Sequence, residues 1–140
     1  MLSHQQSDLS VLVVDDHELT RLSLKLALAK QKNIKLISLA SNGKEAIEIV
    51  ENHQPDVVIL DLQMPVMDGL SAAVKIKTIN PNIKIIAYSS VEDPRVNMTI
   101  STSPLDAFCS KDVSTDYLLR LVNHLSQKSN STQELIQSLA

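Results

Sequence analysis

The sequence predicts an α/β fold in which a five-stranded parallel sheet lies between two layers of helices. Short aliphatic runs alternate with helix-length segments from about residue 11 to residue 126. Uninterrupted apolar runs of this length are typical of strands covered on both faces, as in a parallel sheet. Right-handed connections between such strands place helices on both sides, which gives a (βα)5 chain with three layers. A length of 140 residues suits one such domain.

Five aliphatic runs are the predicted strands. They are residues 11–14, 34–39, 57–60, 83–88 and the weaker 107–109. The helices between them are predicted from apolar residues at helical spacing. These stripes are Leu19, Leu22 and Leu26; Ala46, Ile47 and Val50; Leu70, Ala73, Val74 and Lys77; and Leu118, Leu121, Val122 and Leu125, the last preceded by Ser114 as the candidate N-cap.

The segment between the fourth and fifth strands, residues 92–104, is the weakest of the five expected helices. It contains Pro94, Pro104 and a run of residues that form helices poorly. We therefore expect this helix to be short or irregular.

The ends of the chain are expected to lie outside the folded domain. We assign residues 1–8 to an N-terminal tail, 9–127 to the domain and 128–140 to a C-terminal tail or linker, because residues 126–133 are polar and rich in serine. Residues 134–140 regain helical spacing. They fit either a loosely docked terminal turn or a stalk toward a further domain.

The composition excludes several classes of function. The only aromatic residues are Tyr88, Tyr117 and Phe108, too few for a surface on which single-stranded bases stack. A net charge of −3 argues against a nucleic-acid backbone as a direct partner. One cysteine, Cys109, allows no intramolecular disulfide and fits a reducing cytosol. No stretch resembles a membrane span or a secretory signal, so we expect a cytoplasmic protein without a membrane partner.

Polar side chains follow four of the five predicted strands. Asp15 and Asp16 follow the first, Asp61 the third and Ser89 the fourth, and Lys111 comes shortly after the fifth. Because ligands of an open parallel sheet bind beyond the carboxyl ends of the strands, we expect these groups to converge. Three adjacent carboxylates repel one another, which calls for a cation, and oxygen ligands with room for water favour Mg²⁺ over zinc. Together with a lysine and a hydroxyl, such a site suits phosphoryl transfer to an aspartate.

The order of these motifs resembles the receiver domain of bacterial two-component response regulators over residues 9–127. The matching segments are Val-Leu-Val-Val-Asp-Asp-His at 11–17, Pro-Asp-Val-Val-Ile-Leu-Asp-Leu-Gln-Met-Pro-Val-Met-Asp-Gly at 55–69, Ile-Ile-Ala-Tyr-Ser-Ser at 85–90 and Phe-Cys-Ser-Lys-Asp at 108–112. The resemblance implies a flavodoxin-like sheet with strand order 2-1-3-4-5. The sequence Asp-Asp-His-Glu-Leu-Thr-Arg and the Lys-Asp pair are similar to the NarL/FixJ branch.

The resemblance also implies a role for each residue of the site. Asp61 would be the phosphoacceptor, and Asp15 and Asp16 would hold Mg²⁺ together with Asp61 and the backbone carbonyl of Gln63. Lys111 would bind the phosphoryl group. Ser89 would be the switch hydroxyl and Phe108 the switch aromatic residue. His17, His53 and His124 are expected at the surface or its boundary, not as phosphodonors or metal ligands.

The implied partners are a sensor histidine kinase or a phosphotransfer protein as phosphodonor, and a downstream protein or a C-terminal output domain. A dimer formed on phosphorylation is a further option. Three alternatives stay open. The chain could be a fragment of a NarL/FixJ-type DNA-binding regulator without its helix-turn-helix, an interaction module that works without phosphate, or a haloacid-dehalogenase-type enzyme. Such enzymes normally have an aspartate two residues after the nucleophile, where this chain has Gln63.

Overall fold

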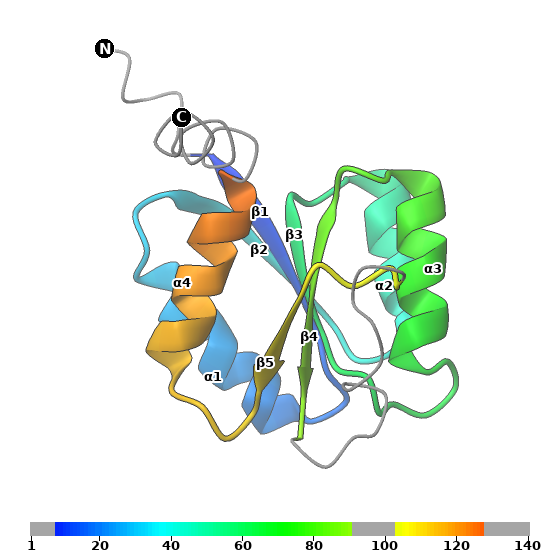
Figure 1. Ribbon diagram of the computed structural model, residues 1–140, viewed down its shortest axis with the longest axis horizontal. Helices are drawn as coiled ribbons and strands as arrows, with labels where there is room; N and C mark the ends of the chain where they lie inside the picture. The colour runs from blue at the N-terminus through cyan, green and yellow to red at the C-terminus, as the bar shows by residue number, and fades with distance from the viewer. Residues whose placement is uncertain (1–7, 91–102, 128–140) are drawn as a thin grey trace, which may run out of the picture.

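The computed structural model describes residues 8–90 and 103–127, and these form a three-layer α/β domain (Figure 1). Its five strands are β1 (Leu9–Val14), β2 (Ile34–Ala40), β3 (Val57–Leu60), β4 (Lys84–Ser89) and β5 (Ala107–Ser110). All neighbouring strands are parallel, in the order β2-β1-β3-β4-β5. The predicted fold class and strand order are therefore confirmed.

Four helices lie in the described part of the chain. They are α1 (Glu18–Ala29), α2 (Gly43–Asn52), α3 (Gly69–Ile79) and α4 (Thr115–Ser126). The irregular helix expected at 92–104 falls almost wholly outside the described residues, as do the two predicted tails. None of the four helices is long and apolar enough to cross a membrane.

The strands alternate their side chains between two cores, one on each face of the sheet. Val11 and Val13 of β1 face α1 and α4, whereas Leu12 and Val14 face α2 and α3. Figure 1 shows the two helix pairs on opposite sides of the sheet. Because every one of these β1 side chains is buried, the strand is an unbroken apolar run, as the sequence predicts.

Two of the four helices in the described part of the chain start at a short side chain that accepts a backbone hydrogen bond. Asn42 caps α2 by accepting from the Glu45 N–H at 2.9 Å, and Asp68 caps α3 by accepting from the Ser71 N–H at 3.0 Å. Ser114 is the N-cap of α4, as predicted, although its side chain makes no capping hydrogen bond. The Asn42 and Asp68 caps fix where the loops at the carboxyl edge of the sheet end and α2 and α3 begin.

The stripe predicted for the first helix is wrong. Leu19 and Leu26 of α1 are 82% and 67% exposed, and Leu22 is also exposed. Leu24 and Leu28 instead pack against the sheet and are almost completely buried. The prediction for α4 is better, because Leu118, Val122 and Leu125 are all buried in the same core.

Candidate functional site

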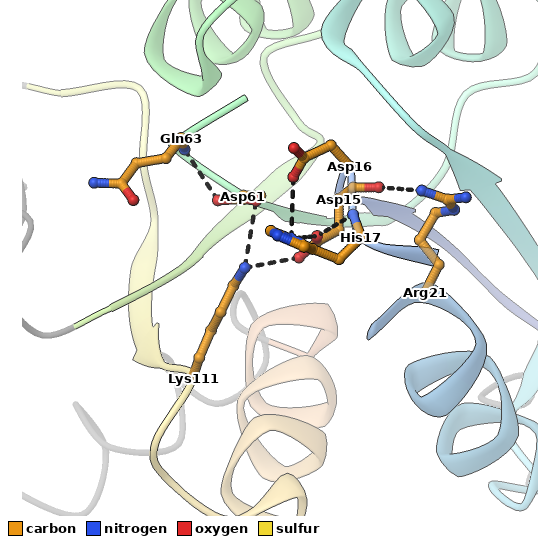
Figure 2. A network of polar contacts seen from close by, with 7 residues as sticks. All are labelled: Asp15, Asp16, His17, Arg21, Asp61, Gln63 and Lys111. Atoms are coloured by element: carbon orange, nitrogen blue, oxygen red, sulfur yellow. Dashed lines mark hydrogen bonds and ion pairs between the residues drawn. The ribbon is translucent and has the colours of Figure 1, made fainter. Parts of the chain in front are cut away.

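The strand order brings Asp15, Asp16, Asp61 and Lys111 together at the carboxyl edge of the sheet, as Figure 2 shows. Asp15 follows β1, and its N–H donates to the Ala40 carbonyl at the end of β2. Asp61 follows β3, and its N–H donates to the Val14 carbonyl at 2.9 Å. The backbones of the two aspartates therefore continue the hydrogen-bond ladder of the sheet.

The Asp61 carboxylate is buried and has two fixed neighbours. Its Oδ1 accepts a hydrogen bond from the Gln63 backbone N–H at 3.0 Å, and its Oδ2 lies 3.3 Å from Lys111 Nζ. Burial, followed by the charge of Asp15, raises the pKa of Asp61, while the Gln63 and Lys111 contacts work in the opposite direction. A buried carboxylate with a raised pKa is a stronger nucleophile than an exposed one, provided that a cation keeps it ionised.

Lys111 is the cation that the described part of the chain places between two of the carboxylates. Its Nζ lies 3.0 Å from Asp15 Oδ2 and 3.3 Å from Asp61 Oδ2. Burial lowers the pKa of Lys111, but the hydrogen bond and charge of Asp15 and the charge of Asp61 outweigh it and raise that pKa overall. The ammonium group therefore stays charged at neutral pH. Its backbone N–H donates to the Ser89 carbonyl at 2.9 Å, which ties β5 to β4 beside the site.

Lys111 also contacts an aromatic ring that the sequence interpretation did not assign to the site. Its Nζ lies 5.7 Å from the centroid of the Tyr88 ring, within the range of a cation–π contact. Burial raises the pKa of Tyr88, so its phenol stays neutral. Tyr88 thus helps to fix the direction of the lysine side chain.

The two predicted switch residues lie on β4 and β5. Ser89 is buried at the end of β4, opposite Ser110 of β5. Phe108 is opposite Ala87 and packs partly buried against the core beneath α2 and α3. Phe108 and Tyr88 therefore lie on opposite faces of the sheet, because Tyr88 packs against the core beneath α1 and α4.

Two residues near Asp15 were not predicted to belong to the site. Arg21 Nη1 donates to the Asp15 backbone carbonyl at 2.6 Å. The His17 N–H donates to Asp15 Oδ1 at 2.9 Å, and its Nδ1 lies 3.0 Å from the same oxygen and 3.1 Å from Asp16 Oδ1. The exposure predicted for His17 is confirmed at 67%, but its contacts with both acidic residues were missed. His53 contacts Ser10 and Ser38, away from these residues.

The carboxylates carry the signature of a cation site. Lys111 Nζ lies 3.0 Å from Asp15 Oδ2 and His17 Nδ1 lies 3.1 Å from Asp16 Oδ1, and within the described residues these two buried atoms have no further polar partner. One ligand atom from each of Asp15, Asp16, His17 and Asp61 lies within 4.8 Å of all the others. Buried carboxylate oxygens without hydrogen bonds are costly unless a positive charge faces them. The donor set therefore fits a hard divalent cation such as Mg²⁺.

Comparison with known proteins identifies this arrangement. Residues 11–123 match the family described as the response regulator receiver domain. The chain belongs to this family. Its sequence is 36% identical over 107 residues to the response regulator protein VraR of Staphylococcus saprophyticus, covering 76% of this chain and 51% of that protein. It is 25% identical over 122 residues to the transcriptional regulatory protein DegU of Brevibacillus brevis, covering 87% of this chain and 52% of DegU.

Solved structures agree with this membership. The receiver domain of a Francisella response regulator superposes with a TM-score of 0.76 at 27% identity, covering 86% of this chain and 98% of that one. A DNA-binding response regulator of the LuxR family from Staphylococcus aureus gives 0.76 at 25% identity, covering 84% and 98%. The relatives place the receiver domain in the NarL branch, as predicted. The chain spans about half the length of the curated relatives it matches.

Proposed function

We propose that this receiver domain accepts a phosphoryl group on Asp61 and thereby switches its interactions with a partner or an output domain. The observation that carries the proposal is the buried Asp61 carboxylate, held by the Gln63 N–H on one oxygen and facing Lys111 on the other. Membership of the receiver family supports a regulatory role in two-component signalling. It disfavours the haloacid-dehalogenase alternative, for which Gln63 also lacks the acidic group.

Each residue of the site has a task in the transfer. A carboxylate oxygen of Asp61 forms the new bond to phosphorus while the bond from phosphorus to the donor breaks, so Asp61 carries the phosphoryl group as an acyl phosphate. Lys111 faces the Asp61 oxygens and would neutralise charge on the incoming group. The Gln63 N–H holds the other oxygen and orients the nucleophile. Ser89, which is buried, is the switch hydroxyl that would turn toward the phosphoryl group on Asp61. Phe108 would be the aromatic ring that moves together with Ser89.

The acidic residues at the same edge would hold Mg²⁺. Asp15, Asp16 and Asp61 would supply carboxylate oxygens, and the Gln63 backbone carbonyl would be a further ligand. A bound Mg²⁺ would offset the negative charge of the carboxylates and of the phosphoryl group. Asp15 and Asp16 are positioned for this by the Ala40 carbonyl and by Arg21, which fix the main chain at the end of β1.

The donor and the output follow from the family and are proposed here in class only. We propose a sensor histidine kinase or a phosphotransfer protein as donor, and a downstream protein or a C-terminal output domain as the target of the switch. A dimer formed on phosphorylation is a third form of output. The alternative of an interaction module that works without phosphate gives Asp61 no chemical role. We therefore rank that alternative below phosphoryl transfer.

Incubation with acetyl phosphate and Mg²⁺ tests the proposal. We expect one phosphoryl group to be added, detected as an increase in intact mass that disappears in mild base, because acyl phosphates hydrolyse there. Asp61→Asn should abolish the increase, since the amide is no nucleophile. Asp68→Asn is the matched control, because Asp68 is an exposed carboxylate on the same loop and asparagine also caps a helix. Unchanged incorporation in Asp61→Asn would overturn the assignment.

A further inference from the structure

His17 lies at the acidic pair in a way that the phosphoacceptor role does not use. It is the N-cap residue of α1 and follows Asp15 and Asp16 directly. Its backbone N–H is anchored on Asp15 Oδ1 at 2.9 Å, so the side chain starts from a fixed point beside the carboxylates. Figure 2 shows the imidazole ring turned toward Asp15 and Asp16 and away from α1.

The distances around His17 Nδ1 match the spacing of neighbouring metal ligands. Nδ1 lies 3.0 Å from Asp15 Oδ1 and 3.1 Å from Asp16 Oδ1. Neighbouring ligands of an octahedral ion with bonds of about 2.1 Å lie about 3.0 Å apart. His17 Nδ1 therefore lies at the spacing of a neighbouring ligand from each of the two carboxylate oxygens.

A second observation points to a cation at the same place. Asp16 Oδ1, one of these two oxygens, is a buried atom that accepts no hydrogen bond within the described part of the chain. Asp15 Oδ2, by contrast, is paired with Lys111 Nζ at 3.0 Å. Lys111 thus neutralises Asp15. Among the described residues, His17 Nδ1 is the only side-chain nitrogen within ion-pair distance of Asp16.

We propose that His17 Nδ1 is a further ligand that gives the acidic site a preference for first-row transition-metal dications over Mg²⁺. The proposal rests on the metal site of the proposed function. Imidazole nitrogen suits cobalt, nickel and zinc, whereas Mg²⁺ prefers hard oxygen and keeps part of its water shell. A nitrogen ligand therefore adds affinity for the transition metals and little for Mg²⁺.

The surroundings of His17 allow this change of role. Without an ion, Nδ1 makes its polar contacts with the two carboxylates. To bind an ion, the ring must be neutral and carry its single proton on Nε2, so that the Nδ1 lone pair points at the metal. Because the His17 side chain is 67% exposed, solvent can hydrogen-bond Nε2 while Nδ1 faces the carboxylates.

The test compares the wild-type protein with His17→Ala in titrations with CoCl2 and, separately, MgCl2. Binding constants are measured by calorimetry at one fixed pH above the ordinary pKa of histidine, about 6.5. The visible absorption of bound Co²⁺ reports its ligands independently. We expect the ratio of Co²⁺ affinity to Mg²⁺ affinity to fall about ten- to hundredfold in His17→Ala, with a change in the Co²⁺ spectrum. His124→Ala, which removes an exposed histidine of α4, is the control and should keep the wild-type ratio.

The outcomes separate this proposal from the one on which it rests. An unchanged affinity ratio and an unchanged Co²⁺ spectrum in His17→Ala would overturn the role of His17, even if both metals bind. An equal loss of affinity for both metals would also overturn it, since it would show a general effect of His17 on the acidic pair. A wild-type protein that binds neither metal would overturn the metal site itself, and the His17 proposal with it.

Discussion

At the scale of single residues, the charge of Asp61 serves the proposed phosphoryl transfer but lowers the stability of the folded chain. The carboxylate is buried at the end of β3 and shares Lys111 with Asp15. Two negative charges and one positive charge therefore lie within contact distance, before Asp16 is counted. Such a site favours binding of a cation, and the folded chain is less stable without one.

The raised pKa of Asp61 makes a prediction about pH. In the unfolded chain the Asp61 carboxyl has its ordinary pKa, so between that value and the raised one the folded state binds more protons. The free energy of unfolding therefore falls as pH rises through this window. Asp61→Asn, without metal, should raise the Tm near neutral pH by about 2–6 °C, as expected for roughly 1 kcal/mol in a domain of this size.

The gain from Asp61→Asn should shrink as pH falls below the raised pKa, where the wild-type carboxyl is already neutral. Thermal melting across the acidic range in the presence of a chelator measures this. Asp68→Asn removes an exposed carboxylate and serves as the control for a change in net charge. A gain that is the same at every pH would show that the shape of the amide, not the lost charge, is responsible.

The acidic residues and Lys111 could be predicted because they follow strands that the sequence reveals. Asp15, Asp61 and Lys111 come directly or almost directly after unbroken apolar runs, and parallel strands end at one edge. The contacts of His17 and Arg21 could not be predicted in this way. These contacts depend on the direction in which α1 leaves the end of β1, which brings His17 and Arg21 back to Asp15.

At the scale of elements, α1 shows why a stripe of leucines did not predict the buried face. The helix has leucines at 19, 22, 24, 26 and 28, so apolar residues lie on more than one side. The face toward the sheet is Arg21, Leu24 and Leu28, which are spaced three and four residues apart. Near the start of the helix this face is polar, because Arg21 donates to the Asp15 carbonyl. A pattern of apolar residues alone therefore does not reveal it.

The loop from β3 to α3 is held in place by close backbone contacts. Met67 N–H donates to the Pro65 carbonyl at 2.8 Å, which puts Val66 in a γ-turn with φ of 73°. A branched residue with positive φ is strained, and such strain persists only where the surroundings hold it. Gly69 provides one of these constraints, because its N–H donates to the Leu62 carbonyl just after Asp61.

Two glycines bordering this loop make a matched test. A Cβ at Gly69 would lie 2.4 Å from the Asp61 carbonyl oxygen and 2.6 Å from Leu62 Cα, both backbone atoms. A Cβ at Gly43 would meet side-chain atoms of Met67 first, with Met67 Cβ at 3.0 Å and Cγ and Sδ at 3.1 Å. Gly69→Ala should lower the free energy of unfolding by about 2–3 kcal/mol, and Gly43→Ala by less than about 1 kcal/mol.

Urea denaturation midpoints, at an unchanged slope, measure both changes. Gly69→Ala should also slow phosphoryl incorporation, because relieving the clash moves the main chain at Asp61. Equal losses of stability in the two variants would contradict this interpretation of the loop.

At the scale of the whole molecule, β5 is a strand of four residues at the edge of the sheet, and among the described strands it pairs only with β4. It is fixed to β4 at both ends. At the carboxyl end, the Lys111 N–H donates to the Ser89 carbonyl. At the other end, Asp106 exchanges hydrogen bonds with Ile85, since its N–H donates to the Ile85 carbonyl and its Oδ2 accepts from the Ile85 N–H, each at 2.8 Å.

Asp106 also joins the start of β5 to α3, in the helix layer formed by α2 and α3. Its Oδ2 lies 2.8 Å from Lys77 Nζ of α3, and the same ammonium group donates to the Ile83 carbonyl at 2.7 Å. The Lys77 and Asp106 side chains are only 21% and 16% exposed. The sequence predicted Lys77 as part of a helix stripe, but not that its charge would meet an aspartate 29 residues away.

Removing Asp106 should therefore weaken the edge of the sheet that carries Lys111. Asp106→Ala leaves the Ile85 N–H and the Lys77 ammonium without this acceptor, and we expect a loss of about 2–3 kcal/mol in the free energy of unfolding. Asp106→Asn keeps an oxygen for the Ile85 N–H and should lose less. Asp112→Ala, at an exposed position after β5, should stay within about 0.5 kcal/mol of the wild type.

Hydrogen exchange distinguishes a local from a general effect of Asp106→Ala. Because β5 is the edge strand of the sheet in the described part of the chain, its amides should exchange faster by more than the global loss of stability accounts for. The amides of the interior strand β1 should follow that global loss. Lys111 follows β5 directly, so the same variant should incorporate phosphoryl groups more slowly while Asp61 itself is intact. Equal acceleration of exchange in β1 and β5 would mean that Asp106 stabilises the domain as a whole and does not specifically hold the strand that positions Lys111.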